Sequence, residues 1–194
     1  LQIVFHSEME EEKGSFDFSD VVDGICRKLI VRHPHVFSDV VANTSEEVLR
    51  NWDTIKMRTK AQKTQTEAMQ SVSKALPALM RSAKVQKKAA KVGFDWPDVG
   101  GALEKVTEEL GELKSAINAH DGDGCREELG DLLFSVVNVS RFLHVDAEEA
   151  LTRASEKFIG RFERVEHLAE KKHIDLQQAA LAELDQLWDE AKKK

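Results

Sequence analysis

The sequence contains no tyrosine and has only three prolines, ten glycines and two cysteines among its 194 residues. The shortage of helix breakers, of aromatic residues and of β-branched runs argues against a sheet-rich fold. Cys26 and Cys125 form no CxxC pair and provide no disulfide framework, which is typical of proteins from a reducing compartment. We therefore expect a cytoplasmic protein.

Long apolar runs and an excess of positive charge are also missing. No apolar run approaches the roughly 20 residues that a helix needs to cross a bilayer. The 28 Lys and Arg residues are outnumbered by 35 Asp and Glu residues, which gives a net charge of −7. Such a chain lacks the basic field that carries non-specific nucleic-acid binding. The sequence predicts neither a membrane nor a nucleic-acid partner.

The residues that are abundant, Ala, Glu, Lys and Leu, favour helices. Amphipathic patterns predict helices over 18–37 and 147–166, and shorter ones over about 44–57, 77–92 and 176–192. Two further stretches, 99–117 and 129–143, each carry one apolar stripe at helical spacing. Because only the Gly-rich turn 120–124 separates them, they should pack as an antiparallel hairpin. The predicted fold class is all-α, a helical bundle.

The two halves of the chain resemble each other. Lys28-Leu-Ile-Val-Arg32 aligns with Lys157-Phe-Ile-Gly-Arg161, and Trp52 aligns with Trp188. We therefore predict three parts: 1–57 as the C-terminal half of a first, truncated unit, 58–73 as a linker, and 74–194 as a complete second unit.

Two acidic pentapeptides in the second unit stand out as a candidate metal site. They are Glu109-Leu-Gly-Glu112-Leu and Glu128-Leu-Gly-Asp131-Leu, and each places two carboxylates on one face of a helix. Gly111 and Gly130 are expected to let the helix backbones approach closely and to leave room for something between them. Carboxylates brought together repel one another unless a cation lies between them. An all-oxygen set favours Mg²⁺, with Mn²⁺ as a substitute.

The simpler interpretation is that these are solvent-exposed acidic residues of amphipathic helices. A bundle stabilised for its own sake would pair them with Lys or Arg four residues further on, but Leu113 and Leu132 occupy those positions. A ferritin-like di-metal site is also disfavoured, because it requires Glu-x-x-His, and position 115 is Ser and position 131 is Asp. The metal interpretation is therefore preferred.

A basic pair and a tryptophan lie further along the chain. Lys157 and Arg161 are neighbours on one helix face, and such a pair can bind the phosphoryl oxygens that a metal leaves free. Trp188 can stack on a nucleobase. As alternatives, the basic side chains are solvated and the tryptophan is an anchor between packed helices.

The motifs as a whole resemble a known family. Glu109-x-x-Glu112, fifteen intervening residues and Glu128-x-x-Asp131 match the ExxE and ExxD signature of the all-α nucleoside triphosphate pyrophosphohydrolases. The surrounding segments, at 33–37, 76–96 and 155–166, resemble the MazG family over essentially the whole chain.

The resemblance implies Mg²⁺-dependent conversion of a nucleoside triphosphate to the monophosphate and pyrophosphate. It also implies that Lys157 and Arg161 contact the triphosphate, that Trp188 lies against the base, and that the chain forms a homodimer. The four carboxylates named above, Glu109, Glu112, Glu128 and Asp131, would be the metal ligands. Glu128 and Asp131 would act in catalysis together with Glu127, which we expect to orient the water that attacks the α-phosphorus or to bind a further metal. Glu108, which also adjoins a ligand, is the second choice for this role. The alternative is a helical interaction module with a vestigial acidic site.

Overall fold

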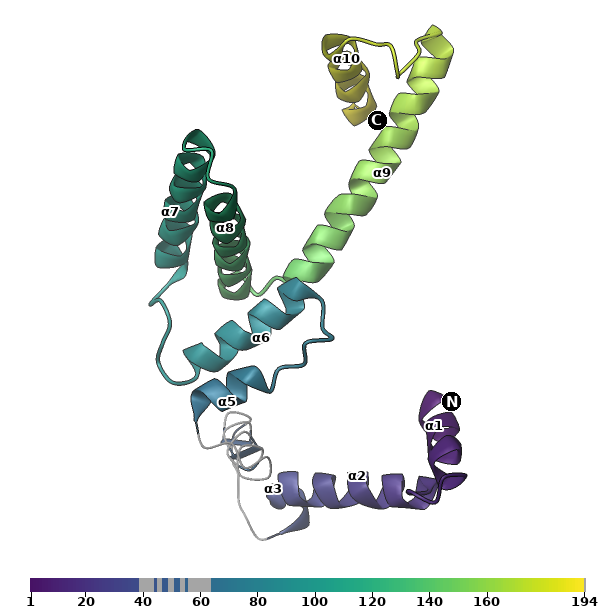
Figure 1. The fold of residues 1–194 in the computed structure, drawn as a ribbon, viewed down its shortest axis with the longest axis vertical. Coiled ribbons are helices and arrows are strands. Elements are labelled where there is room, and N and C mark those ends of the chain that lie inside the picture. Colours follow the sequence, from purple (N-terminus) through teal and green to yellow (C-terminus); the bar gives the residue numbers. More distant parts are fainter. Residues whose placement is uncertain (39–43, 45–46, 49–50, 53–54, 56–63, 194) are drawn as a thin grey trace. The chain divides into compact units, whose positions relative to one another are not determined.

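The computed structural model describes residues 1–38, 44, 47–48, 51–52, 55 and 64–193. Within these residues every regular element is a helix, which confirms the predicted all-α class. The chain divides into two compact units, Leu1–Ser71 and Val72–Lys194 (Figure 1). None of the helices in this described part is long and apolar enough to cross a membrane.

Unit 1 contains α1 (Gln2–Glu11), α2 (Phe18–Arg32), α3 (Pro34–Phe37) and α5 (Gln65–Gln70). The single helix predicted over 18–37 is interrupted at His33, because proline cannot continue the hydrogen-bond ladder and disfavours helical backbone in the residue before it.

Two further helices of unit 1 were not predicted as such. The first helix, α1, was not anticipated, and α5 lies in the segment interpreted as a linker. Thr64 and Glu67 begin α5 with a reciprocal capping box, a local signal that the linker interpretation overlooked. Most of the helix predicted over 44–57 lies outside the described residues. Of its start, the structure shows Glu47 donating its backbone N–H to the Thr44 hydroxyl at 3.2 Å.

Unit 2 contains the helices that carry the acidic motifs. They are α6 (Ala78–Ala90), α7 (Val99–Asn118), α8 (Gly122–Phe142), α9 (Ala147–Lys172) and α10 (Leu181–Lys192). Helices α7 and α8 lie side by side as the predicted antiparallel hairpin (Figure 1). The turn between the two helices is shorter than the predicted 120–124. Asp121 accepts the Gly124 N–H at 3.0 Å as the cap of α8, so the helix already begins at Gly122.

The C-terminal helices α9 and α10 pack together around a small core. Val165 and Ala169 of α9 meet Leu187 and Ala191 of α10, and Trp188 packs against this group. Helix α9 continues beyond the predicted 166 to Lys172. Helix α10 begins at Leu181 rather than 176, because backbone N–H groups of the intervening residues bond to Asp175 in a turn.

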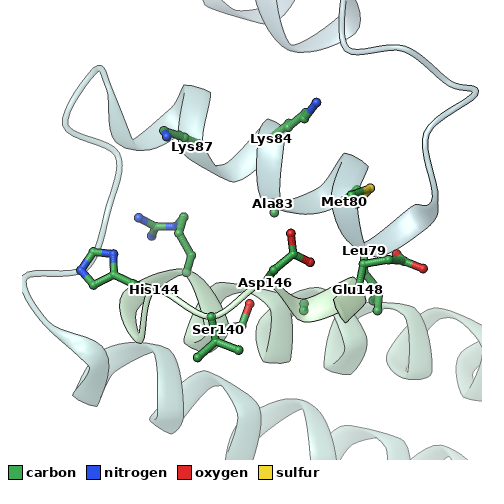
Figure 2. A pocket seen from close by; sticks show the side chains of 12 residues that line it. Leu79, Met80, Ala83, Lys84, Lys87, Ser140, His144, Asp146 and Glu148 are labelled. Atoms are coloured by element: carbon green, nitrogen blue, oxygen red, sulfur yellow. The ribbon is translucent and has the colours of Figure 1, made fainter. Parts of the chain in front are cut away.

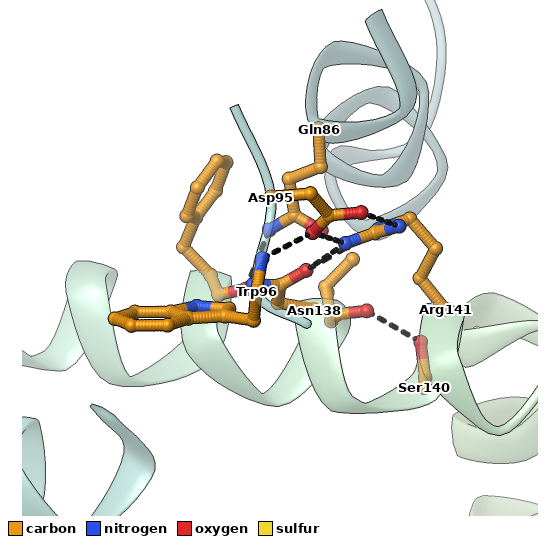
Figure 3. Close-up of polar contacts among 8 residues, drawn as sticks. Gln86, Asp95, Trp96, Asn138, Ser140 and Arg141 are labelled. Atoms are coloured by element: carbon orange, nitrogen blue, oxygen red, sulfur yellow. Dashed lines mark hydrogen bonds and ion pairs between the residues drawn. The ribbon is translucent and has the colours of Figure 1, made fainter. Parts of the chain in front are cut away.

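The connection between α6 and α7 is fixed to α8 by a polar cluster (Figure 3). Arg141 forms a bidentate ion pair with Asp95, with one Nη1–Oδ2 distance of 2.9 Å, and its guanidinium also donates to Asn138. Trp96 follows directly and packs against the first turn of α7, where a Cβ added at Gly101 would lie 2.6 Å from its ring. The first turn of α7, the helix that carries Glu109, is therefore held in place by the connection that precedes it.

Candidate functional site

Three carboxylates converge where α7 and α8 face each other. Glu109 and Glu112 of α7 and Glu128 of α8 each offer an oxygen, and these oxygens lie within 4.8 Å of one another. Asp131, one turn after Glu128, lies outside this set, and its charge acts on Glu128. The hairpin predicted from the apolar stripes is what brings the two acidic motifs to the same place.

The two glycines of these motifs do not have the first of the two roles predicted for them. A Cβ added at Gly111 or at Gly130 would meet no other group within 4 Å. Close approach of the helix backbones therefore does not require a glycine at either position. The expectation that Gly111 and Gly130 bring the backbones together was wrong.

Burial and charge act differently on the three carboxyl groups. Glu109 is only 3% exposed, and its Oε1 pairs with the Lys105 ammonium at 2.5 Å. That hydrogen bond holds the pKa of Glu109 below its ordinary value, in spite of the burial. Desolvation, together with neighbouring carboxylates, raises the pKa of both Glu112 and Glu128. The cluster therefore has more negative charge than its surroundings balance.

This donor set fits a hard divalent cation. Three carboxylates offer only oxygen, which Mg²⁺ and Mn²⁺ prefer over softer ligands. The three oxygens lie within 4.8 Å of one another, so one cation could bind all three once the side chains draw closer together. The acidic cluster is consistent with a metal site.

Lys105 is the residue at this site that sequence reasoning missed. The search for a basic partner considered only positions four residues after each glutamate, and found Leu113 and Leu132. Lys105 lies four residues before Glu109, on the same face of α7. The argument from Leu113 and Leu132 therefore overlooked a basic partner on the preceding turn, and the spacing Lys105-x-x-x-Glu109 was the signal that could have revealed it.

A second group of predicted residues meets between α9 and α10. The Arg161 guanidinium carbon lies 5.7 Å from the centroid of the Trp188 ring, and the Phe158 ring centroid lies 5.0 Å from it. A cavity of about 310 Å³ opens beside these aromatic rings, and Asp185 also lines it. Trp188 also packs on the core of this helix pair, so the alternative interpretation as an anchor is consistent with its contacts.

The basic pair and the acidic cluster are not joined within the described contacts. Lys157 is exposed on α9, one turn before Arg161. Among the residues that the structure describes, neither side chain forms a hydrogen bond or ion pair with Glu109, Glu112 or Glu128.

Another cavity, of about 320 Å³, lies between α6 and the junction of α8 and α9 (Figure 2). Lys84 and Lys87 are at its edge, and the Lys84 side chain extends away from it into solvent. Asp146, on the opposite side, accepts the Glu149 N–H at 3.0 Å and so begins α9. This cavity contains none of the residues predicted to act in the site.

Comparisons with known proteins support one family. The profile of the MazG nucleotide pyrophosphohydrolase domain matches residues 1–37 and 101–166. The chain is 42% identical over 195 residues to the nucleoside triphosphate pyrophosphohydrolase of Escherichia coli K12, covering all of this chain and 74% of that protein.

Two other relatives agree with this match. The nucleoside triphosphate pyrophosphohydrolase/pyrophosphatase MazG of Thermotoga maritima is 42% identical over 192 residues, which cover 99% of this chain and 72% of the relative. The uncharacterized protein YabN of Bacillus subtilis is 45% identical over 196 residues, which cover all of this chain and 40% of the relative. The chain therefore belongs to the family of MazG nucleotide pyrophosphohydrolase domains.

Proposed function

We propose that this chain hydrolyses nucleoside triphosphates to monophosphates and pyrophosphate, with a Mg²⁺ site between α7 and α8. The observation that carries the proposal is the convergence of Glu109, Glu112 and Glu128 within 4.8 Å in a MazG domain. Three carboxylates held this close to one another repel each other, and the repulsion destabilises the site unless they bind something positive. Mn²⁺ is expected to substitute for Mg²⁺.

The proposed metal ligands are the three converging glutamates and Asp131. Asp131 follows Glu128 by three residues on α8, so both carboxylates lie on the same face of that helix. A divalent cation held there would supply neutralisation of the phosphate charge and a more acidic water. Glu127 is adjacent to Glu128, and its carboxylate is proposed to orient the water that attacks the α-phosphorus. Pyrophosphate then leaves in line with the attack.

The remaining phosphate oxygens are assigned to Lys157 and Arg161. Both cations can form charge-assisted hydrogen bonds with a polyphosphate, and Arg161 can bind two oxygens at once. Trp188 lies under the Arg161 guanidinium, and the adjoining cavity offers aromatic surface to a nucleobase. Stacking of this kind does not distinguish one base from another.

We further propose that the chain acts as a homodimer. The helices of unit 2 expose apolar side chains that a second copy could cover. These include Leu103 and Leu110 of α7, Leu129 and Leu133 of α8, and Leu151 and Ile159 of α9, each at least 40% exposed. A second copy could also bring its basic pair to the acidic cluster, since no described contact links the two sets within one chain.

In this proposal residues 74–194 form the catalytic unit. Residues 1–57 repeat its basic pair and its tryptophan, as Lys28, Arg32 and Trp52, but the two acidic pentapeptides, ELGEL and ELGDL, occur only in the second half of this sequence. We place the protein in the cytoplasm, on the basis of its cysteine usage.

The test is pyrophosphate release from a panel of ordinary and modified nucleoside triphosphates, with and without Mg²⁺. We expect Mg²⁺-dependent release from the parent chain, and a loss of about 100-fold or more in the Glu128→Ala/Asp131→Ala variant, because metal catalysis contributes several kcal/mol. Absence of release from every nucleotide, in a parent chain that folds and binds Mg²⁺, would instead favour an interaction module with a vestigial site.

A further inference from the structure

Lys105 pairs with one member of the acidic cluster, Glu109, and with the neighbouring Glu108. Its ammonium lies 2.5 Å from Glu109 Oε1 and 2.9 Å from Glu108 Oε1. Glu109 is the most buried of the three converging carboxylates. The Lys105 side chain itself is 38% exposed, so its stem lies along α7 while its end reaches the cluster.

The cluster depends on this one ammonium for its positive charge. Among the described ion pairs, the only one that involves Glu109, Glu112 or Glu128 is that between Lys105 and Glu109. A buried carboxylate without a partner is strongly destabilising. The metal-free chain therefore needs Lys105 in order to hold the buried Glu109 carboxylate in place.

A metal bound to Glu109 would bind the carboxylate group that already accepts from Lys105. Glu109 Oε1 accepts from Lys105, and Glu109 is also one of the three residues that can hold the metal. A divalent cation and an ammonium on the same carboxylate would repel each other in a partly buried site. Lys105 can yield, because its side chain is long, flexible and partly in solvent.

We propose that Lys105 is a positioning residue: its ammonium acts as a stand-in cation that keeps the carboxylates assembled without metal and is displaced from Glu109 when metal binds. The proposal rests on the metal site proposed above. It predicts that Lys105 stabilises the metal-free chain and weakens its affinity for metal. A metal ligand would instead strengthen that affinity, and a merely structural residue would not weaken it.

The test is calorimetric titration of the chain with Mn²⁺ and Mg²⁺ in the absence of nucleotide. Lys105→Met removes the charge and keeps the length, and we expect its metal Kd to fall about tenfold, within the usual range of coupling between two sites. Lys105→Arg keeps the charge and should bind metal like the parent. Lys114→Met removes an equal charge from the opposite face of α7 and serves as the matched control.

Thermal melting provides the second measurement. In EDTA, Lys105→Met should melt at a lower temperature than Lys114→Met, and saturating Mg²⁺ should abolish this difference. Should Lys105→Met not fold, Lys105→Gln retains a hydrogen-bond donor and takes its place. Unchanged or weaker metal binding by the neutral variants overturns the proposal.

The two proposals fail in different ways. A parent chain that binds neither Mn²⁺ nor Mg²⁺ would overturn the metal site and, with it, the role of Lys105. A parent chain that binds metal and releases pyrophosphate, with neutral Lys105 variants of unchanged metal Kd, would overturn the role of Lys105 alone.

Discussion

Helices α2 and α9 carry the same basic motif in the two units, and both place an arginine over a tryptophan. The Arg32 guanidinium carbon lies 5.6 Å from the Trp52 ring centroid, and that of Arg161 lies 5.7 Å from the Trp188 ring centroid. Within the described residues, carboxylates converge into a possible metal site only in unit 2, at Glu109, Glu112 and Glu128.

The comparison distinguishes a contact that both units share from the acidic cluster that the proposed chemistry requires. The stacked arginine and tryptophan occur in both units, so this contact is not by itself a sign of substrate binding. Cation–π stacking contributes to packing wherever two such residues meet. The acidic cluster is the feature that distinguishes the proposed catalytic unit, and the matched pair of basic motifs offers controls within one chain.

The largest expected effect comes from removing one basic pair at a time. Lys157→Ala/Arg161→Ala should raise KM for the nucleotide by about 100-fold or more, because hydrogen bonds to charged groups contribute about 1.5–3 kcal/mol each. Lys28→Ala/Arg32→Ala should leave KM and kcat close to those of the parent. Steady-state pyrophosphate release measures both variants, and equal defects would show that the two units act alike.

Metal-dependent stability should also distinguish the units. At Mg²⁺ about 100 times its Kd, bound metal contributes about 2.7 kcal/mol, which raises Tm by about 5–10 °C for a chain of this size. Glu128→Ala/Asp131→Ala should lose this rise. The control variant Glu11→Ala/Glu12→Ala, at the end of α1, should retain the rise in Tm. A parent chain whose Tm does not change with Mg²⁺ would contradict the proposed site.

A smaller effect is expected from the tryptophans. Trp188→Phe keeps an aromatic ring on the core of α9 and α10 but weakens the stacking with Arg161, so KM should rise about threefold, in line with a cation–π contribution of about 0.5–1 kcal/mol. Trp52→Phe should not change KM. A change of similar size in both variants would indicate that each tryptophan acts only through packing.

The smallest effect concerns pH in the absence of metal. Because the folded pKa of Glu128 is raised by desolvation and neighbouring carboxylates, protonation stabilises the folded chain, and this stabilisation is lost as pH rises through the raised value. Glu128→Gln should therefore melt slightly above the parent in EDTA at pH 7. The difference should vanish as pH falls toward 4.5, and saturating Mg²⁺ at pH 7 should reverse its sign.

Local patterns were enough to predict the hairpin that forms the site. The apolar stripes over 99–117 and 129–143 predicted α7 and α8, and the hairpin brings Glu109, Glu112 and Glu128 together, as the doubled motif indicated. Helix ends were less accurate. The start of α8 is set by a side-chain hydrogen bond, because Asp121 caps it directly after α7. The end of α2 is set by the ring of Pro34, which divides a continuous apolar pattern.

Contacts between distant segments could not be predicted from the sequence. Asp95 and Arg141 belong to separate patterns, and only the packed structure shows that they form an ion pair. Lys105 is a different case, because its spacing from Glu109 was visible and was not considered. The opposite effects on the pKa of Glu109 and of Glu128 also depend on burial, which residue spacing does not determine.

The packing of Trp96 against Gly101 has a consequence for enzyme variants. Any larger side chain at Gly101 would have to displace a ring that is only 2.6 Å from the new Cβ. Because Trp96 adjoins Asp95, the displacement would pull on the ion pair that holds the α6–α7 connection to α8. Gly101→Ala would thus be a remote inactivating mutation: it would impair alignment of the α7 carboxylates with those of α8 while every catalytic group remains in the sequence.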